Sequence, residues 1–331
     1  MKKVKRLSTS VWNRMVLNSL FFNIDSCNLN YSKDTASFSL MIHNQLENLR
    51  KISLCCRLAF YLLLKNTIHM STKIKPKGLL FTGILIGAVL LMSFIITPGR
   101  VTVYLAGDST MAIKQPKAFP ETGWGMPFSL LFDSTVTVDN RAQNGRSTKT
   151  FISEGLWDGI VSSLHEGDYV FIQFGHNDEV PTKKSYINEQ GYRDNLERFI
   201  RETRDKKAIP VLLTPVARRK FDTTGTVVGT HEVYSAIVRK LAEEQKVPLI
   251  DLDRESQALL QKLGPEESKK LFNYLAPGES INYPNGQADN THFSKLGAQK
   301  IAGIVLKGIR LLKLDLARHI ALSNLKPVDE K

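Results

Sequence analysis

The chain has 331 residues, enough for one large domain or two modest ones, and Lys and Arg together exceed Asp and Glu by 13. The excess lies almost entirely in residues 1–100, which hold 14 Lys and Arg against 3 Asp and Glu. The remaining residues hold 31 against 29 and are nearly neutral, so the overall charge does not indicate a surface that binds DNA or RNA.

An apolar segment in the first third of the chain predicts export. Residues 79–96 are almost wholly apolar and follow Lys73, Lys75 and Lys77. A basic flank before an apolar run is typical of a secretory signal or a signal anchor, and at roughly 1.5 Å per residue this run just spans a bilayer. We therefore expect residues 70–100 to be a signal peptide or a signal anchor.

Cleavage of this segment is left open by the sequence. No Ala-x-Ala site follows the apolar run, which favours an anchor, but only residues 97–100 separate the run from the first predicted strand. In either case we expect the globular part to be periplasmic, extracellular or held outside the membrane. Contact with a membrane is expected only through this segment.

Residues 1–69 resemble neither of the regions that follow. Signal sequences lie at the amino terminus, and Met70 opens a segment typical of one, so our hypothesis is that translation begins at Met70. Residues 1–69 would then be a non-native extension or disordered. All three cysteines, Cys27, Cys55 and Cys56, lie in that region. The rest of the chain therefore offers no disulfide, cysteine metal site or cysteine nucleophile.

From residue 101 onward, short apolar strands alternate with helical segments. Strands are expected at 101–106, 134–139, 168–174, 210–214 and 247–252, and helices at about 124–132, 157–164, 186–204, 233–245 and 294–312. Buried strands separated by helices predict one three-layer α/β/α domain over residues 101–331, with a five-stranded parallel sheet. Residues 214–230 are the least periodic, and we expect a loop at the edge of the site or a solvated basic turn.

Small and polar residues follow three of the predicted strands. The first strand ends in Gly107-Asp108-Ser109, the second leads to Gly145, and the third stops before Asn177. Open α/β sheets place their ligands at the carboxyl ends of the strands, which makes Ser109 a candidate nucleophile. The alternative is structural, because Asp-Ser-Thr after a strand is also an ordinary helix N-cap.

Asp289 and His292 stand directly before the last predicted helix. At this spacing both can lie on one turn, where the carboxylate accepts the Nδ1 proton and leaves the other ring nitrogen to take a proton from a serine. A neutral serine hydroxyl is a weak nucleophile without such a base. The alternative for His292 is a residue at the start of a helix with an exposed ring. No Gly-x-Ser-x-Gly segment is present, so the α/β-hydrolase fold lacks its signature.

Together these segments resemble the four sequence blocks of the GDSL/SGNH hydrolases. The resemblance is greatest to the rhamnogalacturonan acetylesterases, covers residues 101–309, and rests on segments 104–111, 123–125, 144–147, 173–178, 214–216 and 289–293. It implies the SGNH hydrolase fold, in which the parallel sheet is flavodoxin-like. It also implies an enzyme that needs no cofactor, in agreement with the absence of a zincin motif or a phosphate-binding glycine loop.

The resemblance also implies a role for each matching residue. Ser109 is the expected nucleophile, His292 the general base and Asp289 the carboxylate that orients it. The expected oxyanion hole comprises the backbone N–H groups of Ser109 and Gly145 and the side-chain amide of Asn177, each such donor being worth about 3 kcal/mol in the transition state. Structural alternatives are a turn at Gly145 and a helix cap at Asn177.

The expected activity is removal of O-acetyl groups from a polysaccharide, above all the rhamnogalacturonan of pectin. Alternatives are a GDSL lipase or lysophospholipase that acts on longer acyl chains, a carbohydrate-binding protein without catalysis, and transfer of the acetyl group to an acceptor sugar. Four residues are candidates for substrate binding: Trp124, Arg146, His176 and Arg218. Their structural alternatives are packing of Trp124 under the pocket, a structural hydrogen bond at His176, and solvated charge at both arginines.

Overall fold

The computed structural model describes residues 100–321. The chain divides into two compact units, residues 1–96 and 97–331, and the described residues all belong to the second. The predicted signal or anchor at 79–96, the hypothesis about residues 1–69 and the three cysteines lie outside the described residues. In residues 100–321 no helix has both the length and the apolar character needed to cross a membrane.

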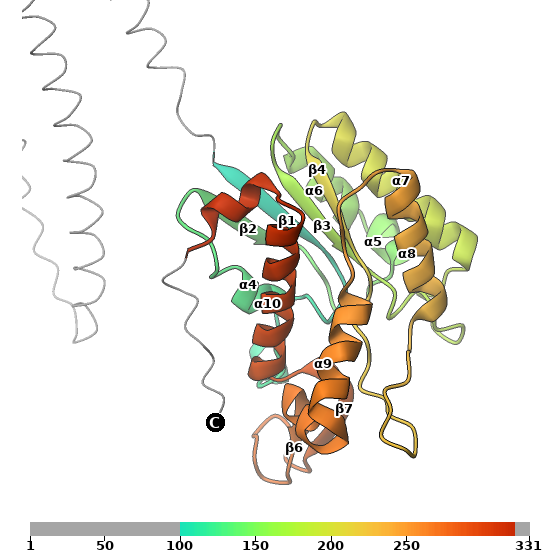
Figure 1. Cartoon of the computed structure of the whole chain (residues 1–331), viewed down its shortest axis with the longest axis vertical. Helices are drawn as coiled ribbons and strands as arrows, with labels where there is room; N and C mark the ends of the chain where they lie inside the picture. The colour runs from blue at the N-terminus through green and yellow to red at the C-terminus, as the bar shows by residue number, and fades with distance from the viewer. Residues whose placement is uncertain (1–99, 322–331) are drawn as a thin grey trace, which may run out of the picture. The chain divides into compact units, whose positions relative to one another are not determined.

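Five parallel strands form the central sheet, in the spatial order β2-β1-β3-β4-β5 (Figure 1). Their bounds are β1 Val101–Gly107, β2 Val136–Asn140, β3 Tyr169–Gln173, β4 Ile209–Leu213 and β5 Leu249–Ile250. This order is that of the doubly wound flavodoxin-like sheets. The predicted fold, three α/β/α layers around a parallel sheet, is confirmed.

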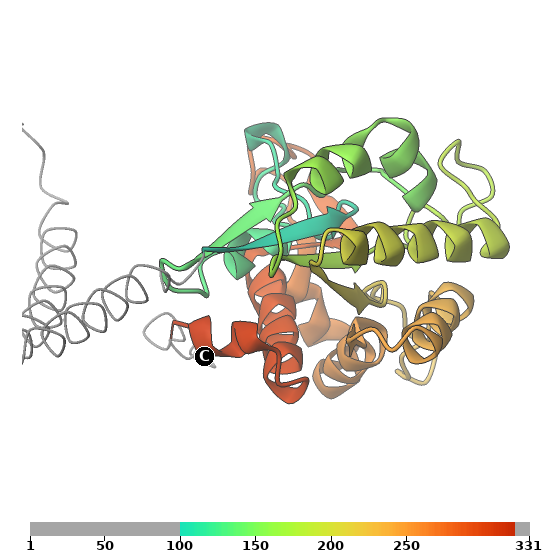
Figure 2. The ribbon, with the colours of Figure 1, turned by 90° about the horizontal axis from the view of Figure 1, so that it is seen from above.

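Helices cover the sheet on both sides (Figure 2). Their bounds are α4 Gly125–Phe128, α5 Thr148–Ser153, α6 Leu156–Ser163, α7 Glu189–Asp205, α8 Glu232–Glu244, α9 Leu252–Glu267 and α10 Lys295–Leu311, with 3-10 turns η1 Pro116–Ala118, η2 Ser268–Leu271 and η3 Asp315–His319. Helices α4, α9 and α10 pack on one face of the sheet, and α5 to α8 on the other. Parallel strands between two helical layers are buried on both faces, which explains their continuous apolar sequences.

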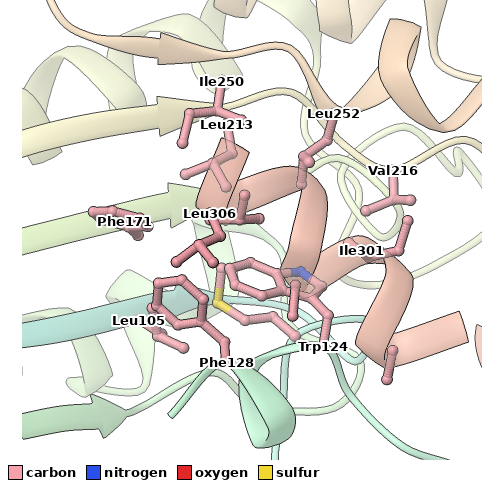
Figure 3. Packing of buried hydrophobic residues seen from close by; sticks show 14 of the residues in the cluster. Leu105, Trp124, Phe128, Phe171, Leu213, Val216, Ile250, Leu252, Ile301 and Leu306 are labelled. Atoms are coloured by element: carbon pink, nitrogen blue, oxygen red, sulfur yellow. The ribbon is translucent and has the colours of Figure 1, made fainter. Parts of the chain in front are cut away.

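The side chains of β1 alternate between two apolar cores. Val103 and Leu105 belong to the core that α10 covers, and Leu306 of α10 belongs to the same cluster as Leu105 (Figure 3). Tyr104 and Ala106 point to the opposite face and join the core under α6 and α7. Side chains of a strand alternate with a period of two, so this single strand anchors both layers. The segment that carries the nucleophile candidate therefore begins from a rigid support.

Several predictions differ from the structure. The helix expected at about 124–132 is only α4, four residues long, and α9 was not predicted. The strand expected at 247–252 is only Leu249–Ile250, because Asp251 accepts a hydrogen bond from the backbone N–H of Arg254 and starts α9. A two-stranded antiparallel sheet of β6 Phe272–Leu275 and β7 Gln287–Phe293 was not predicted. Apart from Ala288 and Phe293, β7 has polar residues, so its sequence lacks the apolar pattern of a strand.

Candidate active site

Ser109 lies two residues beyond the end of β1, in a turn held by its neighbours. The carboxylate of Asp108 accepts hydrogen bonds from the backbone N–H and the hydroxyl of Thr110, at 2.9 and 2.7 Å. At Gly107 a Cβ would come within 2.8 Å of the carbonyl oxygen of Gln173, so only glycine fits where β1 meets β3. The turn thus presents Ser109 at the carboxyl end of the sheet.

The three predicted catalytic residues meet at this edge. His292 Nε2 lies 2.9 Å from Ser109 Oγ, and His292 Nδ1 lies 2.7 Å from Asp289 Oδ2. Asp289 and His292 both belong to β7, where residues three apart would normally face opposite sides. The other oxygen of Asp289 accepts the backbone N–H groups of Thr291 and His292, at 2.6 and 3.0 Å. The pairing of β7 with β6 is irregular between Ala288 and Phe293, and these bonds hold that stretch so that the carboxylate and the imidazole lie side by side.

The carboxylate of Asp289 is ionised at neutral pH. Burial raises its pKa, but the hydrogen bonds from the ring and backbone of His292, with the charge of that ring, outweigh burial and lower the pKa to about 2. An ionised Asp289 accepts the Nδ1 proton, which leaves the Nε2 lone pair directed at Ser109 Oγ. The arrangement therefore has the geometry of a general base next to a nucleophile.

The donors predicted for the oxyanion hole keep N–H groups that are available to a ligand. In residues 100–321 the backbone N–H groups of Ser109 and Gly145 have no hydrogen-bond acceptor. Gly145 adopts a left-handed φ of 77°, which favours glycine, and a Cβ there would meet open space. Asn177 Nδ2 donates to the carbonyl oxygen of Arg146 at 3.1 Å, while its Oδ1 accepts from Lys183 Nζ at 3.0 Å. These two contacts fix the orientation of the amide and leave one N–H for a ligand.

A polar pocket of about 350 Å³ opens at this site. Its lining residues are Ser109, Glu121, Asn144, Gly145, His176, Asn177, Lys183, Arg218, Thr291 and His292. The nucleophile candidate, its imidazole and all three predicted oxyanion donors thus line one cavity. Most of the wall consists of side chains that form hydrogen bonds, as in a site for a hydroxylated ligand.

Trp124 does not line the pocket, and its predicted contact with substrate is wrong. The Trp124 ring is fully buried and packs on the ring of Phe128, with the two ring centroids 5.5 Å apart (Figure 3). Its Nε1 donates to Gln173 Oε1, and Gln173 Nε2 donates to Thr110 Oγ1, both at 2.7 Å. The structural alternative therefore holds. Trp124 packs under the pocket and supports the turn that carries the nucleophile.

The two predicted arginines have different positions. Arg218 lines the pocket, where its guanidinium donates to Thr291 Oγ1 at 2.6 Å and brings the loop after β4 to the edge of the site. Arg146 lines an adjoining hollow instead, where its Nη2 lies 2.8 Å from Glu154 Oε2 in an ion pair. Arg218 therefore remains a candidate for contact with substrate, and Arg146 is separated from the catalytic pocket.

His176 lines the pocket with a nearly buried ring. Its Nδ1 lies 3.3 Å from Asp108 Oδ2, and its ring packs against His231 with centroids 4.4 Å apart. Burial is the largest influence and lowers the pKa of His176 to about 4, so the ring is neutral at physiological pH. His176 thus has access to the pocket, and its approach to Asp108 is a close contact in which neither atom forms a hydrogen bond within residues 100–321.

Four lining residues of the pocket, and Lys114 beside it, were missed by the sequence analysis. Lys114, Glu121 and Lys183 lie in stretches without a recognisable motif. Asn144 and Thr291 were included only as members of the segments 144–147 and 289–293. The side chain of Lys114 is fully buried, a rare state for lysine that no local pattern indicates. Asn144 could have been recognised from the sequence, because Asn144-Gly145 follows a predicted strand just as Gly107-Asp108-Ser109 does.

Comparison with known proteins identifies the family. The sequence profile of the GDSL-like lipase/acylhydrolase family matches residues 105–300, more than half of the chain. The chain belongs to this family. The matched stretch of this GDSL-like hydrolase includes the nucleophile candidate, the imidazole–carboxylate pair and the oxyanion donors. Members of this class are carboxylic ester hydrolases, and the chain is one of them.

Curated relatives of this GDSL-like hydrolase carry a narrower description. Rhamnogalacturonan acetylesterase RhgT of Bacillus subtilis is 43% identical over 221 residues, which cover 66% of this chain and 94% of the relative. The probable rhamnogalacturonan acetylesterase YesY of the same organism is 36% identical over 220 residues, or 66% of this chain and 96% of the relative. The predicted resemblance to rhamnogalacturonan acetylesterases is confirmed.

A solved structure has the same fold as this GDSL-like hydrolase. The crystal structure of the YxiM protein from Bacillus subtilis superposes with a TM-score of 0.57 at 28% sequence identity. The alignment covers 65% of this chain and 58% of that protein, so the chain spans little more than half of its length. The similarity supports the assignment of the α/β/α fold.

Proposed function

We propose that the protein is a serine esterase that removes O-acetyl groups from a polysaccharide, with acetylated rhamnogalacturonan as the substrate. The observation that carries the chemical part is the 2.9 Å separation of Ser109 Oγ and His292 Nε2 in an open polar pocket. The substrate is proposed from the two curated relatives described above, each similar to this chain over nearly its whole length.

The first half of the proposed reaction acetylates the enzyme. Ser109 Oγ attacks the acetyl carbonyl carbon while its proton moves to His292 Nε2. Asp289 stays ionised and stabilises the imidazolium. The negative oxygen of the tetrahedral intermediate accepts hydrogen bonds from the N–H groups of Ser109 and Gly145 and from Asn177 Nδ2. His292 then protonates the sugar oxygen, the bond between that oxygen and the acetyl carbon breaks, and acetyl-Ser109 remains.

The second half restores the enzyme. A water molecule loses a proton to His292 Nε2 and attacks the acetyl carbon through the same intermediate. The bond to Ser109 Oγ breaks as His292 returns a proton to that oxygen, and acetate leaves. Transfer to an acceptor sugar would use the same acetyl-enzyme, so products formed with and without added oligosaccharide distinguish transfer from hydrolysis.

The polar wall of the pocket favours a sugar ester over a long acyl chain. Glu121, His176, Lys183 and Arg218 line it, and an acyl chain of eight carbons would displace water from these polar groups at a cost in free energy. We expect acetate esters to be hydrolysed faster than octanoate esters of the same alcohol. Faster octanoate turnover would support the lipase alternative instead.

The Ser109→Ala variant tests the mechanism. We expect the variant to lose release of acetate from acetylated rhamnogalacturonan and from an aryl acetate while its circular dichroism spectrum matches that of the wild type. Unchanged turnover would contradict the role of Ser109. A wild-type protein that binds the polysaccharide without releasing acetate would support the carbohydrate-binding alternative.

We also propose that the enzyme is exported, on the basis of the basic and apolar residues at 73–96. Fractionation of cells that express the full chain tests this. Activity in the periplasm, in the medium or on an outward membrane face is expected, and activity confined to the cytosol would contradict it.

A further inference from the structure

Lys114 carries a charge on a side chain without exposure to solvent. Its ammonium lies 2.5 Å from the carbonyl oxygen of Ser109, 3.0 Å from Asn144 Oδ1 and 2.5 Å from Glu121 Oε1. A lysine ammonium has three N–H donors, so each donor has its own acceptor. Burial of an ion pair stabilises a protein little by itself, and a set of contacts this specific instead fixes the geometry of the groups it joins.

Asn144 is held a second time by another cation. Arg146 Nη1 donates to the backbone carbonyl oxygen of Asn144 at 2.9 Å, and the rest of the same guanidinium is anchored on Glu154 Oε2, 2.8 Å from its Nε. Lys114 therefore contacts the side chain of Asn144, and Arg146 contacts its carbonyl group. We call Lys114, Asn144 and Arg146 the Asn144 clamp.

The clamp acts on the residue that precedes Gly145. The carbonyl group of Asn144 and the N–H of Gly145 belong to one planar peptide group, so a contact that fixes the oxygen also fixes the direction of the N–H. A cation that bonds to the carbonyl oxygen polarises the peptide and makes its N–H a stronger donor. Lys114 also bonds the carbonyl oxygen of Ser109, which joins the turn after β1 to the turn after β2.

We propose that Lys114 and Arg146 are positioning residues for the Asn144–Gly145 peptide. Lys114 fixes the side chain of Asn144, and Arg146 orients and polarises the peptide itself, so that the Gly145 N–H donates to the oxyanion of the transition state. This inference rests on the proposed function, which places that N–H in the oxyanion hole. It also gives Arg146 a role different from the contact with substrate expected from the sequence. All three donors of Lys114 are occupied, so Lys114 has none left for a ligand.

Four variants test the clamp: Lys114→Met, Asn144→Ala, their double variant and Arg146→Met. Misplacement of one oxyanion donor by about 1 Å costs up to about 100-fold in rate. We expect kcat for an aryl acetate to fall about 10- to 100-fold in Lys114→Met, Asn144→Ala and Arg146→Met, with KM changed less than about threefold. Asn144→Ala keeps two acceptors for Lys114, and so tests the contact even where Lys114→Met does not fold.

Two further readouts separate positioning from loss of structure. Methylboronic acid forms a tetrahedral adduct with a catalytic serine, and we expect its affinity to fall by the same factor as kcat. The double variant should be no less active than the less active of the two single variants, because both substitutions remove the same contact between Lys114 and Asn144. Arg141→Met is the matched control. Arg141 also follows β2, but its Nε donates to Asp139 Oδ1 at 2.8 Å, away from the clamp. We expect this variant to keep the kcat of the wild type.

The outcomes distinguish this inference from the proposed function. Wild-type kcat in Lys114→Met and Asn144→Ala, together with an inactive Ser109→Ala, would overturn the clamp and leave the esterase mechanism intact. Increased KM at unchanged kcat would also overturn it, because that pattern indicates direct contact with substrate. Full activity of Ser109→Ala would contradict the proposed function and the clamp together.

Discussion

The carboxylate of Asp289 bonds both the ring and the backbone of His292. One oxygen lies 2.7 Å from Nδ1, and the other accepts the backbone N–H of the same residue at 3.0 Å. A single side chain therefore shapes the end of β7 and fixes the orientation of the imidazole. The two functions can be separated by substitution, because each oxygen has its own partner.

Replacement of Asp289 by Asn should abolish most activity and leave the fold intact. Asn keeps one oxygen for the backbone N–H groups of Thr291 and His292, but presents an N–H to Nδ1 and favours the wrong tautomer. A loss of kcat of about 10⁴-fold is expected by analogy with serine hydrolases of other folds. Steady-state kinetics with an aryl acetate and urea unfolding measure the two effects. A loss of less than tenfold in a folded variant would contradict the assigned orientation.

Gly145 and Gly155 form a matched pair for a test of the oxyanion turn. Their φ angles are 77° and 72°, and a Cβ would meet open space at both. Substitution by Ala should cost each variant about 1–2 kcal/mol of unfolding free energy through backbone strain. Only Gly145→Ala should lower kcat, because Gly155 lies at the start of α6. Equal kcat values in the two variants would argue against donation by the Gly145 N–H.

Trp124→Phe should destabilise the protein without weakening binding of substrate. The substitution removes the donor to Gln173 Oε1 and leaves a buried acceptor unpaired, which costs about 1–3 kcal/mol. Urea unfolding gives the loss of stability, and KM for acetylated oligosaccharides should change less than twofold. A large increase in KM at unchanged stability would instead restore the role of a sugar-stacking ring.

Asp178 should make stability depend on pH. Burial is the dominant influence and raises its pKa to about 7, although Thr148 donates its N–H and its hydroxyl to Oδ1, both at 2.7 Å. Because the folded pKa exceeds the unfolded value, the contribution of Asp178 is fully present below about pH 4. It is lost as pH rises through about 7, by at most about 4 kcal/mol.

The Asp178→Asn variant measures this dependence. Asn keeps an oxygen for both Thr148 donors and has no charge to bury. Relative to the wild type, the variant should therefore gain unfolding free energy between pH 5 and pH 8. Urea titrations at several pH values give the difference, and a constant difference across this range would contradict the raised pKa.

Much of the fold and the main site residues could be predicted because their signals are local. The strand at β1 and the turn residues of Gly107-Asp108-Ser109 are adjacent in sequence, and parallel strands place their carboxyl ends at one edge. From these facts Ser109, Gly145 and Asn177 were expected at one edge of the sheet, and the resemblance to the GDSL/SGNH hydrolases implied their roles. Asp289 and His292 could be paired because their spacing is short.

Other features depended on contacts between distant segments. Trp124 was expected to contact substrate, but its burial depends on α10 and β3, and its hydrogen bond reaches Gln173, 49 residues away. In the Asn144 clamp, the hydrogen bond from Lys114 Nζ to Asn144 Oδ1 joins two residues that are 30 positions apart in the sequence. The sequence around a lysine does not differ between a lysine on a solvated surface and one in a buried ion pair. No local rule therefore distinguishes the two cases.

Chain order and local chemistry thus set the order of strands and helices, the turn after β1 and the residue types available for ester hydrolysis. Which of those residues touch one another was decided by packing of the layers. Burial and hydrogen-bond partners are properties of groups brought together from separate segments, and the free energy of each contact exists only once the sheet and its two helical layers have assembled.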